Sequence, residues 1–141
     1  MVRDHRKLRV FHEADSAALE TYRVTAEMPQ AERYGLQAQI RRAAVSVAAN
    51  IVEGTARGTL VEYCRFLRIA HGSARECGYL LGLAGRLGFL DADHCQAMLC
   101  QYDSLGAALF SLVRTLEESR STVSSQSERA LAGGRPYPVA D

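Results

Sequence analysis

Apolar residues recur at intervals of three and four along most of this 141-residue chain, which is the period of an α-helix. No segment alternates apolar and polar residues between turn signals, as a half-buried strand would. The pattern predicts four helical segments. The first covers about residues 10–27, and the second begins between Pro29 and Leu36 and ends at about residue 53. The third covers about residues 59–87, and the fourth begins at Asp91 or Asp93 and ends at about residue 120. Because short connections between long helices force neighbours to run antiparallel, we expect an all-α, antiparallel up-down-up-down four-helix bundle.

The apolar stripe of each segment predicts its buried face. In the fourth segment the stripe alternates steps of four and three, a heptad pattern that comprises Met98, Tyr102, Leu105, Leu109, Leu112 and Leu116. The third stripe comprises Leu60, Tyr63, Leu67, Ala70, Ala74, Cys77, Leu81 and Ala84. The first stripe is the least regular and comprises Phe11, Ala14, Ala18, Tyr22 and Thr25.

The second segment is apolar on two sides. Its core face comprises Leu36, Ile40, Ala43, Ala44, Val47 and Ile51. A second small, apolar face comprises Ala38, Val45, Ala49 and Val52. A helix of this kind either lies centrally in its bundle or packs on another subunit, so this face favours a homo-oligomer.

Glycines punctuate the third segment. Each interior glycine costs a helix about 1 kcal/mol relative to alanine, and four occur, Gly72, Gly78, Gly82 and Gly85. They predict either a close approach to another helix or a kink near residues 82–85. Gly88 follows as the expected C-terminal cap.

The chain length fits one domain, with 48% hydrophobic residues. We expect a basic N-terminal arm over residues 1–9, the bundle over 10–120, and a flexible, Ser-rich C-terminal tail over 121–141. No apolar stretch approaches the ~20 residues of a membrane span, and no signal-peptide pattern follows the basic N-terminus. A cytoplasmic protein with no membrane partner is therefore expected.

The four cysteines, Cys64, Cys77, Cys95 and Cys100, all lie inside helical segments and lack CxxC spacing. We interpret them as small apolar thiols rather than as disulfide partners or metal ligands. The histidines show no HxxxH or HExxH spacing either. We expect no metal and no cofactor.

Charge is distributed unevenly although the net charge is only +1. Residues 33–90 hold eight basic and three acidic side chains, whereas residues 91–141 hold four basic and seven acidic ones. Lys7 is the only lysine, so the basic residues are almost all arginine, which suits bidentate contacts with phosphate. A coding bias toward arginine would produce the same composition.

The arginines of the middle segments are the candidates for nucleic-acid binding. Arg68, Arg75 and Arg86 share one face of the third segment and span 18 residues, roughly 27 Å at the rise of an α-helix. A repeated positive track of this kind is what binding to a phosphate backbone needs. The full candidate set is Arg41, Arg42, Arg65, Arg68, Arg75 and Arg86. The alternative is an ordinary solvated face.

A polar stripe follows one side of the second segment. It comprises Gln39, Arg42, Ser46, Asn50, Glu53 and Arg57. Asparagine inside a helix lowers stability unless its amide finds partners, so we interpret the stripe as a hydrogen-bond network to neighbouring helices or another subunit. A ligand or nucleic-acid contact is the alternative. An active site is disfavoured, because Glu53 and Asn50 have no nucleophile beside them, and we predict no catalytic residues.

Two runs carry a family resemblance. The first is Q-x-R-R-A-A-x-S from Gln39 to Ser46, followed by N-I-x-E-G from Asn50 to Gly54, and the second covers residues 66–76. Together they resemble the four-helix bundle protein family, which includes proteins encoded in intervening sequences of large-subunit ribosomal RNA genes and accessory variability determinants of diversity-generating retroelements. The resemblance implies a four-helix bundle, assembly into rings of five, and RNA or a reverse transcriptase as a partner.

The sequence thus predicts a non-enzymatic, oligomeric four-helix bundle that binds RNA or a nucleic-acid enzyme through a basic face. The alternative is a purely structural assembly module that binds no nucleic acid. An enzyme of unrecognised chemistry is a third and least favoured hypothesis.

Overall fold

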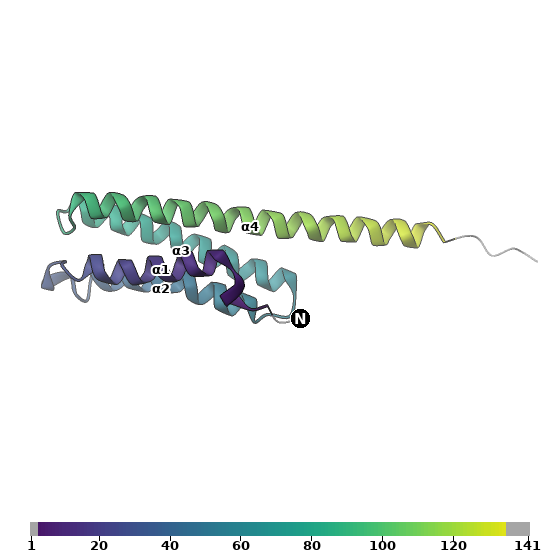
Figure 1. The fold of residues 1–141 in the computed structure, drawn as a ribbon, viewed down its shortest axis with the longest axis horizontal. Helices are drawn as coiled ribbons and strands as arrows, with labels where there is room; N and C mark the ends of the chain where they lie inside the picture. Colours follow the sequence, from purple (N-terminus) through teal and green to yellow (C-terminus); the bar gives the residue numbers. More distant parts are fainter. Residues whose placement is uncertain (1–2, 135–141) are drawn as a thin grey trace, which may run out of the picture.

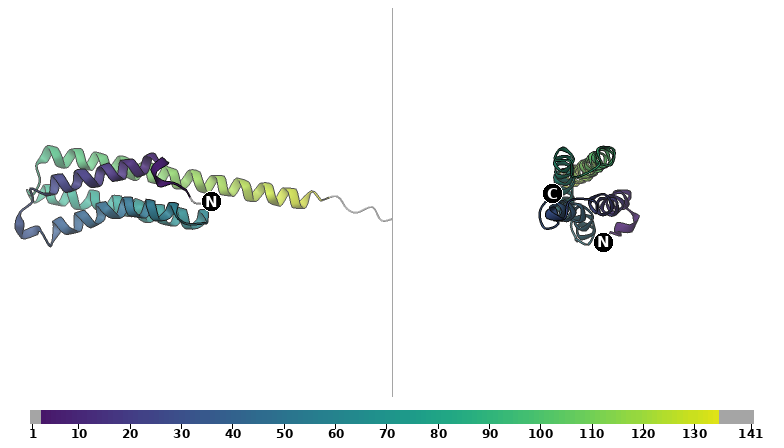
Figure 2. Two further views of the ribbon diagram at one scale, coloured as in Figure 1. Left: turned by 60° about the horizontal axis from the view of Figure 1, so that its bottom comes forward. Right: turned by 90° about the vertical axis from the view of Figure 1, so that its left-hand side faces the viewer.

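A computed structural model describes residues 3–134 of the chain. The helices within this range are η1 (His5–Lys7), α1 (Arg9–Thr25), η2 (Gln30–Glu32), α2 (Leu36–Thr55), α3 (Leu60–Arg86) and α4 (Ala92–Ala132). Each α-helix packs beside the next in the chain, and α1 also contacts α4 (Figures 1 and 2). The predicted all-α, up-down-up-down bundle is confirmed.

Caps at the helix ends fix the two turns that flank α3. The Thr59 hydroxyl accepts a hydrogen bond from the Glu62 N–H at 3.2 Å, and the Asp91 carboxylate accepts the N–H of His94 at 3.1 Å. At the other end of α3, Gly88 adopts a φ of 76°, a left-handed conformation that favours glycine. The predicted cap at Gly88 is therefore present, and of the two possible starts of the fourth segment, Asp91 and Asp93, Asp91 is the N-cap.

The core stripes of α2, α3 and α4 lie inside the bundle, as their periodicity predicts. In α4, Leu112 and Leu116 are only half-buried, because they approach the end of the bundle. The stripe predicted for α1 was right at Ala14 and Thr25 but about one position off at Phe11, Ala18 and Tyr22. Its buried residues are Val10, Ala14, Ala17, Thr21, Val24 and Thr25, whereas Tyr22 lies at the rim.

The shift in α1 has a physical reason. Thr21 can be buried because its hydroxyl bonds to the Ala17 carbonyl and to the Tyr102 hydroxyl, both at 2.7 Å. The pattern of apolar residues alone does not reveal a polar residue whose partner comes from another helix.

The glycines of α3 bring it close to α4. A Cβ atom added at Gly85 would lie 2.6 Å from the Cys95 sulfur, and one at Gly82 would lie 3.7 Å from Leu99. The helix is continuous through residues 82–85. The absence of a side chain at Gly85 therefore allows α3 to approach α4 closely.

The two ends of the chain are arranged differently. The N-terminal arm is tied to the bundle, since the Arg3 N–H donates to the Thr55 carbonyl at 3.0 Å and its guanidinium lies over the Tyr63 ring. Helix α4 does not end near residue 120 but continues to Ala132 and projects past the bundle (Figure 1). Hydroxyls such as those of Ser121 and Thr122 bond to carbonyls one turn earlier, so they do not break the helix. The rest of the predicted tail, residues 135–141, lies outside the described residues, as do residues 1–2 of the arm.

None of the helices in residues 3–134 is both long enough and apolar enough to cross a membrane.

Candidate nucleic-acid interface

Two of the candidate arginines are held in ion pairs. Arg65 pairs with Glu62, one turn away on α3, at 3.1 Å. Arg68 pairs with Glu117, which comes from the part of α4 near the end of the bundle. Acidic side chains therefore reduce the positive charge along the N-terminal half of α3.

Arg75 and Arg86 lie on the same helix without such partners. Both are exposed, and neither forms an ion pair within the described residues. The stem of Arg75 lies over Gly106 of α4, where an added Cβ would be 3.7 Å from the Arg75 Cδ. Arg86 is the last residue of α3 and lies beside the turn into α4. The C-terminal half of α3 is thus the half whose arginines are not held in ion pairs within the described residues.

Arg41 has a structural task. Its Nε donates to the Thr25 hydroxyl at 3.0 Å, and its Nη2 donates to the Tyr22 carbonyl at 3.1 Å. The guanidinium also lies 4.4 Å from the centre of the Tyr22 ring. Beside it, the Gln37 amide donates to the Thr25 carbonyl at 2.7 Å. Gln37 and Arg41 therefore supply further donors to carbonyls at the C-terminal end of α1, where the Thr25 carbonyl also accepts the Met28 N–H and the Tyr22 carbonyl also accepts the Thr25 hydroxyl.

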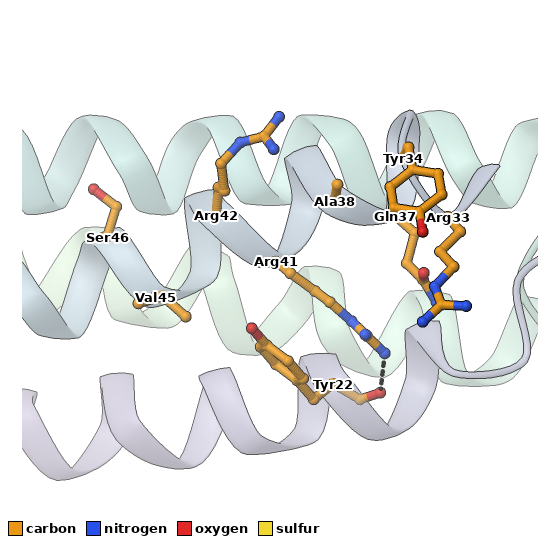
Figure 3. A pocket seen from close by; sticks show the side chains of 9 residues that line it. All are labelled: Tyr22, Arg33, Tyr34, Gln37, Ala38, Arg41, Arg42, Val45 and Ser46. Atoms are coloured by element: carbon orange, nitrogen blue, oxygen red, sulfur yellow. Dashed lines mark hydrogen bonds between the residues drawn. The ribbon is translucent and has the colours of Figure 1, made fainter.

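Arg42 points away from α1 (Figure 3). It is exposed and makes no ion pair or side-chain hydrogen bond within residues 3–134. Two contacts between α2 and α3, Ser46 to Ser73 and Cys77 to the Ile40 carbonyl, fix the register of the helices. In that register Arg42 of α2 and Arg75 of α3 lie at similar heights along the bundle.

A groove lies on the outer side of α2, with a volume of about 690 Å³, and we call it the α2 groove. Its lining residues are Tyr22, Arg33, Tyr34, Gln37, Ala38, Arg41, Arg42, Val45 and Ser46 (Figure 3). Three of the nine are arginine and none is acidic. The Arg33 guanidinium lies 5.7 Å from the centre of the Tyr34 ring, so each of two tyrosines has an arginine beside it.

Sequence reasoning did not single out Tyr22, Arg33, Tyr34 or Gln37 as site residues. A signal existed for Gln37, which is a polar residue in helical register with the buried Ile40 and Ala44. Arg33 and Tyr34 precede α2, so helical periodicity says nothing about where they lie. Tyr22 was assigned to the core by its stripe.

The polar stripe of α2 divides into two parts. The Ser46 and Ser73 hydroxyls bond to each other at 2.8 Å, and the Asn50 amide donates to the Ser46 carbonyl at 2.8 Å and to its hydroxyl at 3.0 Å. The Ser46–Ser73 bond ties α2 to α3, and Asn50 supports Ser46 from within α2. The other members are exposed: Glu53 pairs with Arg57 at 2.9 Å, whereas the side chains of Gln39 and Arg42 have no hydrogen-bond partner within the described residues.

The buried polar groups are protonated and enclosed. Burial raises the pKa of the Cys77 thiol to about 12. Burial likewise raises the pKa of Tyr102, an effect that its hydrogen bond to Thr21 opposes. Cys64 and Cys95 are also buried free thiols, whereas Cys100 is exposed. Within residues 3–134, no group of three His, Cys, Asp or Glu side chains is placed to hold a metal ion.

Comparison with known proteins places this arrangement in a family. No curated protein matches the chain. A crystal structure of a protein with unknown function from the S23 ribosomal protein family of Bacteroides thetaiotaomicron VPI-5482 has a similar fold, with a TM-score of 0.69 and 20% identity over 74% of this chain and 97% of that one. The model of the 23S rRNA-intervening sequence protein family matches residues 6–111, and the chain therefore belongs to this family.

Proposed function

We propose that the protein is a non-enzymatic RNA-binding bundle that contacts phosphates through Arg33, Arg42, Arg75 and Arg86, which we call the free-arginine surface. The observation that carries the proposal is that all four side chains are exposed and form no ion pair within the described residues. Arginine is suited to phosphate because its planar guanidinium donates two parallel hydrogen bonds. The name of the family refers to intervening sequences of 23S rRNA, which agrees with an RNA partner.

These arginines lie over different helices, since Arg42 lines the α2 groove and Arg75 lies over Gly106 of α4. Arg42 and Arg75 lie at similar heights, and Arg33 and Arg86 lie near the turns at one end of the bundle. Eleven residues separate Arg75 from Arg86, which is about 16 Å along α3. Glu76 follows Arg75 in the chain but forms no ion pair within the described residues. The free-arginine surface therefore places positive charge at two positions along the bundle axis rather than at one.

Fluorescence anisotropy with a labelled, structured RNA at low salt tests the proposal. We expect the parent protein to bind, with log affinity falling by about 0.7 to 0.9 per phosphate contact for each tenfold rise in salt. The Arg75→Glu/Arg86→Glu variant should lose binding while keeping the helical circular dichroism of the parent.

The control is Arg65→Glu/Arg68→Glu, which changes the net charge equally but removes arginines that are already paired. It should retain most of the binding. Absence of binding by the parent, or equal losses in the two variants, would contradict the proposal.

The second candidate is the assembly module, and the apolar outer face of α2 favours it. Val45 is 46% exposed, Ala49 is also exposed, and Ala38 and Val52 are half-buried. We propose that this face packs on further copies of the chain, as a pentamer if the family resemblance extends to assembly. A reverse transcriptase as a further partner stays a prediction.

Light scattering after size-exclusion chromatography tests assembly. The parent should elute well above its monomer mass of 15.5 kDa. Ala49→Glu should reduce that mass, because it places a charge on the apolar face, whereas Ala107→Glu on the exposed side of α4 should not. A monomeric parent at micromolar concentration would contradict self-assembly.

A further inference from the structure

We infer that the α2 groove binds unpaired nucleotides of single-stranded RNA, with a base against its tyrosines and phosphates on its arginines. This inference rests on the proposed function and narrows its substrate class. The first support is charge: the lining holds three arginines and no acidic residue, so the groove is complementary to an anion. Arg33 and Arg42 are exposed, whereas Arg41 is anchored to α1 and supplies a charge at a fixed position.

The second support is the aromatic and apolar character of the lining. Tyr34 is 88% exposed and Tyr22 is 45% exposed, so both rings present surface to solvent. Ala38 lies between Tyr34 and Arg42 in the groove, and its short side chain leaves space there (Figure 3). Flat rings beside guanidinium groups form the kind of surface on which bases of single strands stack.

The third support is size. A volume of about 690 Å³ falls in the range of sites that hold small organic ligands, so a nucleotide or two fits. Bases inside a duplex are already stacked and cannot reach such a groove, whereas bases in single strands and loops can turn outward. The groove therefore favours unpaired over paired RNA, while phosphate contacts alone would not discriminate between them.

The test compares two RNA probes of the same sequence, a short single strand that contains 2-aminopurine and its blunt duplex. With the parent protein we expect the single strand to bind more tightly and its 2-aminopurine fluorescence to change on stacking. Tyr34→Ala should weaken single-strand binding by about 5- to 100-fold, as expected for loss of one stacking ring, and leave duplex binding unchanged.

Tyr79→Ala is the matched control, because Tyr79 is 62% exposed on α3 and does not line the groove. It should leave the stacking signal in place. Both tyrosines are exposed enough that neither variant should unfold the bundle, and circular dichroism checks this.

Three results would overturn the inference, and each identifies a different cause. If Tyr34→Ala has no effect, or no more than Tyr79→Ala, the groove is not the base site, although RNA binding through the free-arginine surface would stand. If the parent binds neither probe, the proposed function fails as well. If Tyr34→Ala lowers the oligomer mass, a second copy of the chain occupies the groove.

Discussion

The two flanks of α2 use the same residue type in opposite ways. Arg41 and Arg42 are neighbours in sequence and about 100° apart around the helix. Arg41 faces the end of α1, where the Thr25 hydroxyl and the Tyr22 carbonyl accept its hydrogen bonds. Arg42 faces solvent and meets no such acceptor within the described residues. The two residues are of the same type and differ in their surroundings, because α1 ends in front of Arg41 and not in front of Arg42.

Helix α3 repeats the contrast along its length. Arg68 meets Glu117 of α4 near the end of the bundle, whereas Arg75 lies against Gly106 of the same helix. Enclosed or paired groups hold the bundle together, and exposed, unpaired groups remain for a ligand. Four predictions would break or sharpen this division.

The largest effect should come from alkaline pH, which acts on the enclosed groups. Because the pKa of Cys77 is raised from 9.0 to about 12, its protonated thiol contributes stability that is complete below pH 9 and is lost as the pH rises toward 12. Tyr102 acts in the same direction, since burial raises its pKa as well. The urea midpoint of unfolding, measured by circular dichroism, should fall steadily from pH 9 to pH 12.

Tyr102→Phe provides the comparison for the alkaline experiment. It removes one of the enclosed groups whose pKa is raised by burial, a set that also includes Tyr63 and Cys95, so the midpoint of the variant should fall less steeply above pH 9, from a lower value at neutral pH. A midpoint that stays constant across this range in the parent would show that the enclosed groups do not control stability.

The next effect should come from the flank of α2 that packs on α1. Arg41→Met removes charge-assisted hydrogen bonds and should lower the free energy of unfolding by about 1.5 to 3 kcal/mol. Gln37→Leu should lower it by about 1 kcal/mol, because Thr25 loses one donor to its carbonyl. Arg42→Met, the matched control, should change it by no more than about 0.5 kcal/mol. Equal effects of Arg41→Met and Arg42→Met in urea unfolding would remove the contrast between the flanks.

The same contrast marks the limit of sequence-based prediction here. The sequence located the cores of α2, α3 and α4, the cap at Gly88 and the start of α4 at Asp91 or Asp93, because these features depend on residues close together in the chain. It placed Arg41 and Arg42 together in one basic set and Arg68 with Arg75 in one stripe. Periodicity gives the angle of a side chain around its own helix, but a partner such as Thr25 or Glu117 comes from another helix.

The end of α4 and the α2 groove were missed for related reasons. The serine-rich segment after residue 120 was predicted to be a flexible tail, since its composition is poor in apolar residues. The serine hydroxyls instead bond to carbonyls within the helix. The groove needs Tyr22 of α1 beside Arg33 and Tyr34 of the turn, and that meeting depends on the packing of α1 against α2.

A smaller effect should follow from converting a paired arginine into a free one. Glu117→Gln releases Arg68, which lies about 10 Å along α3 from Arg75 and extends the free-arginine surface. RNA affinity should rise several-fold, and the slope of log affinity against log salt concentration should steepen by about 0.7 to 0.9, the value of one added phosphate contact.

Glu128→Gln removes the same charge from the same helix, and in this control the affinity and the slope should stay close to those of the parent. Identical anisotropy titrations of the two variants would mean that pairing with Glu117 does not withhold Arg68 from RNA.

The smallest effect concerns the two parts of the polar stripe. Asn50→Leu should lower the free energy of unfolding by about 1 kcal/mol, because the half-buried Ser46 hydroxyl loses the amide that donates to it. Glu53→Leu should lower it by less than about 0.5 kcal/mol, since the pair with Arg57 is exposed and its members are four residues apart.

A double-mutant cycle of Asn50→Leu with Ser46→Ala distinguishes a network from two independent side chains, because only contacting residues show a coupling energy in urea unfolding. A measurable coupling would make Ser46, Asn50 and Ser73 the structural part of the stripe and leave Gln39 and Arg42 as its exposed part. Additive losses, or equal losses at Asn50 and Glu53, would mean that the hydrogen bonds between α2 and α3 do not separate the two parts.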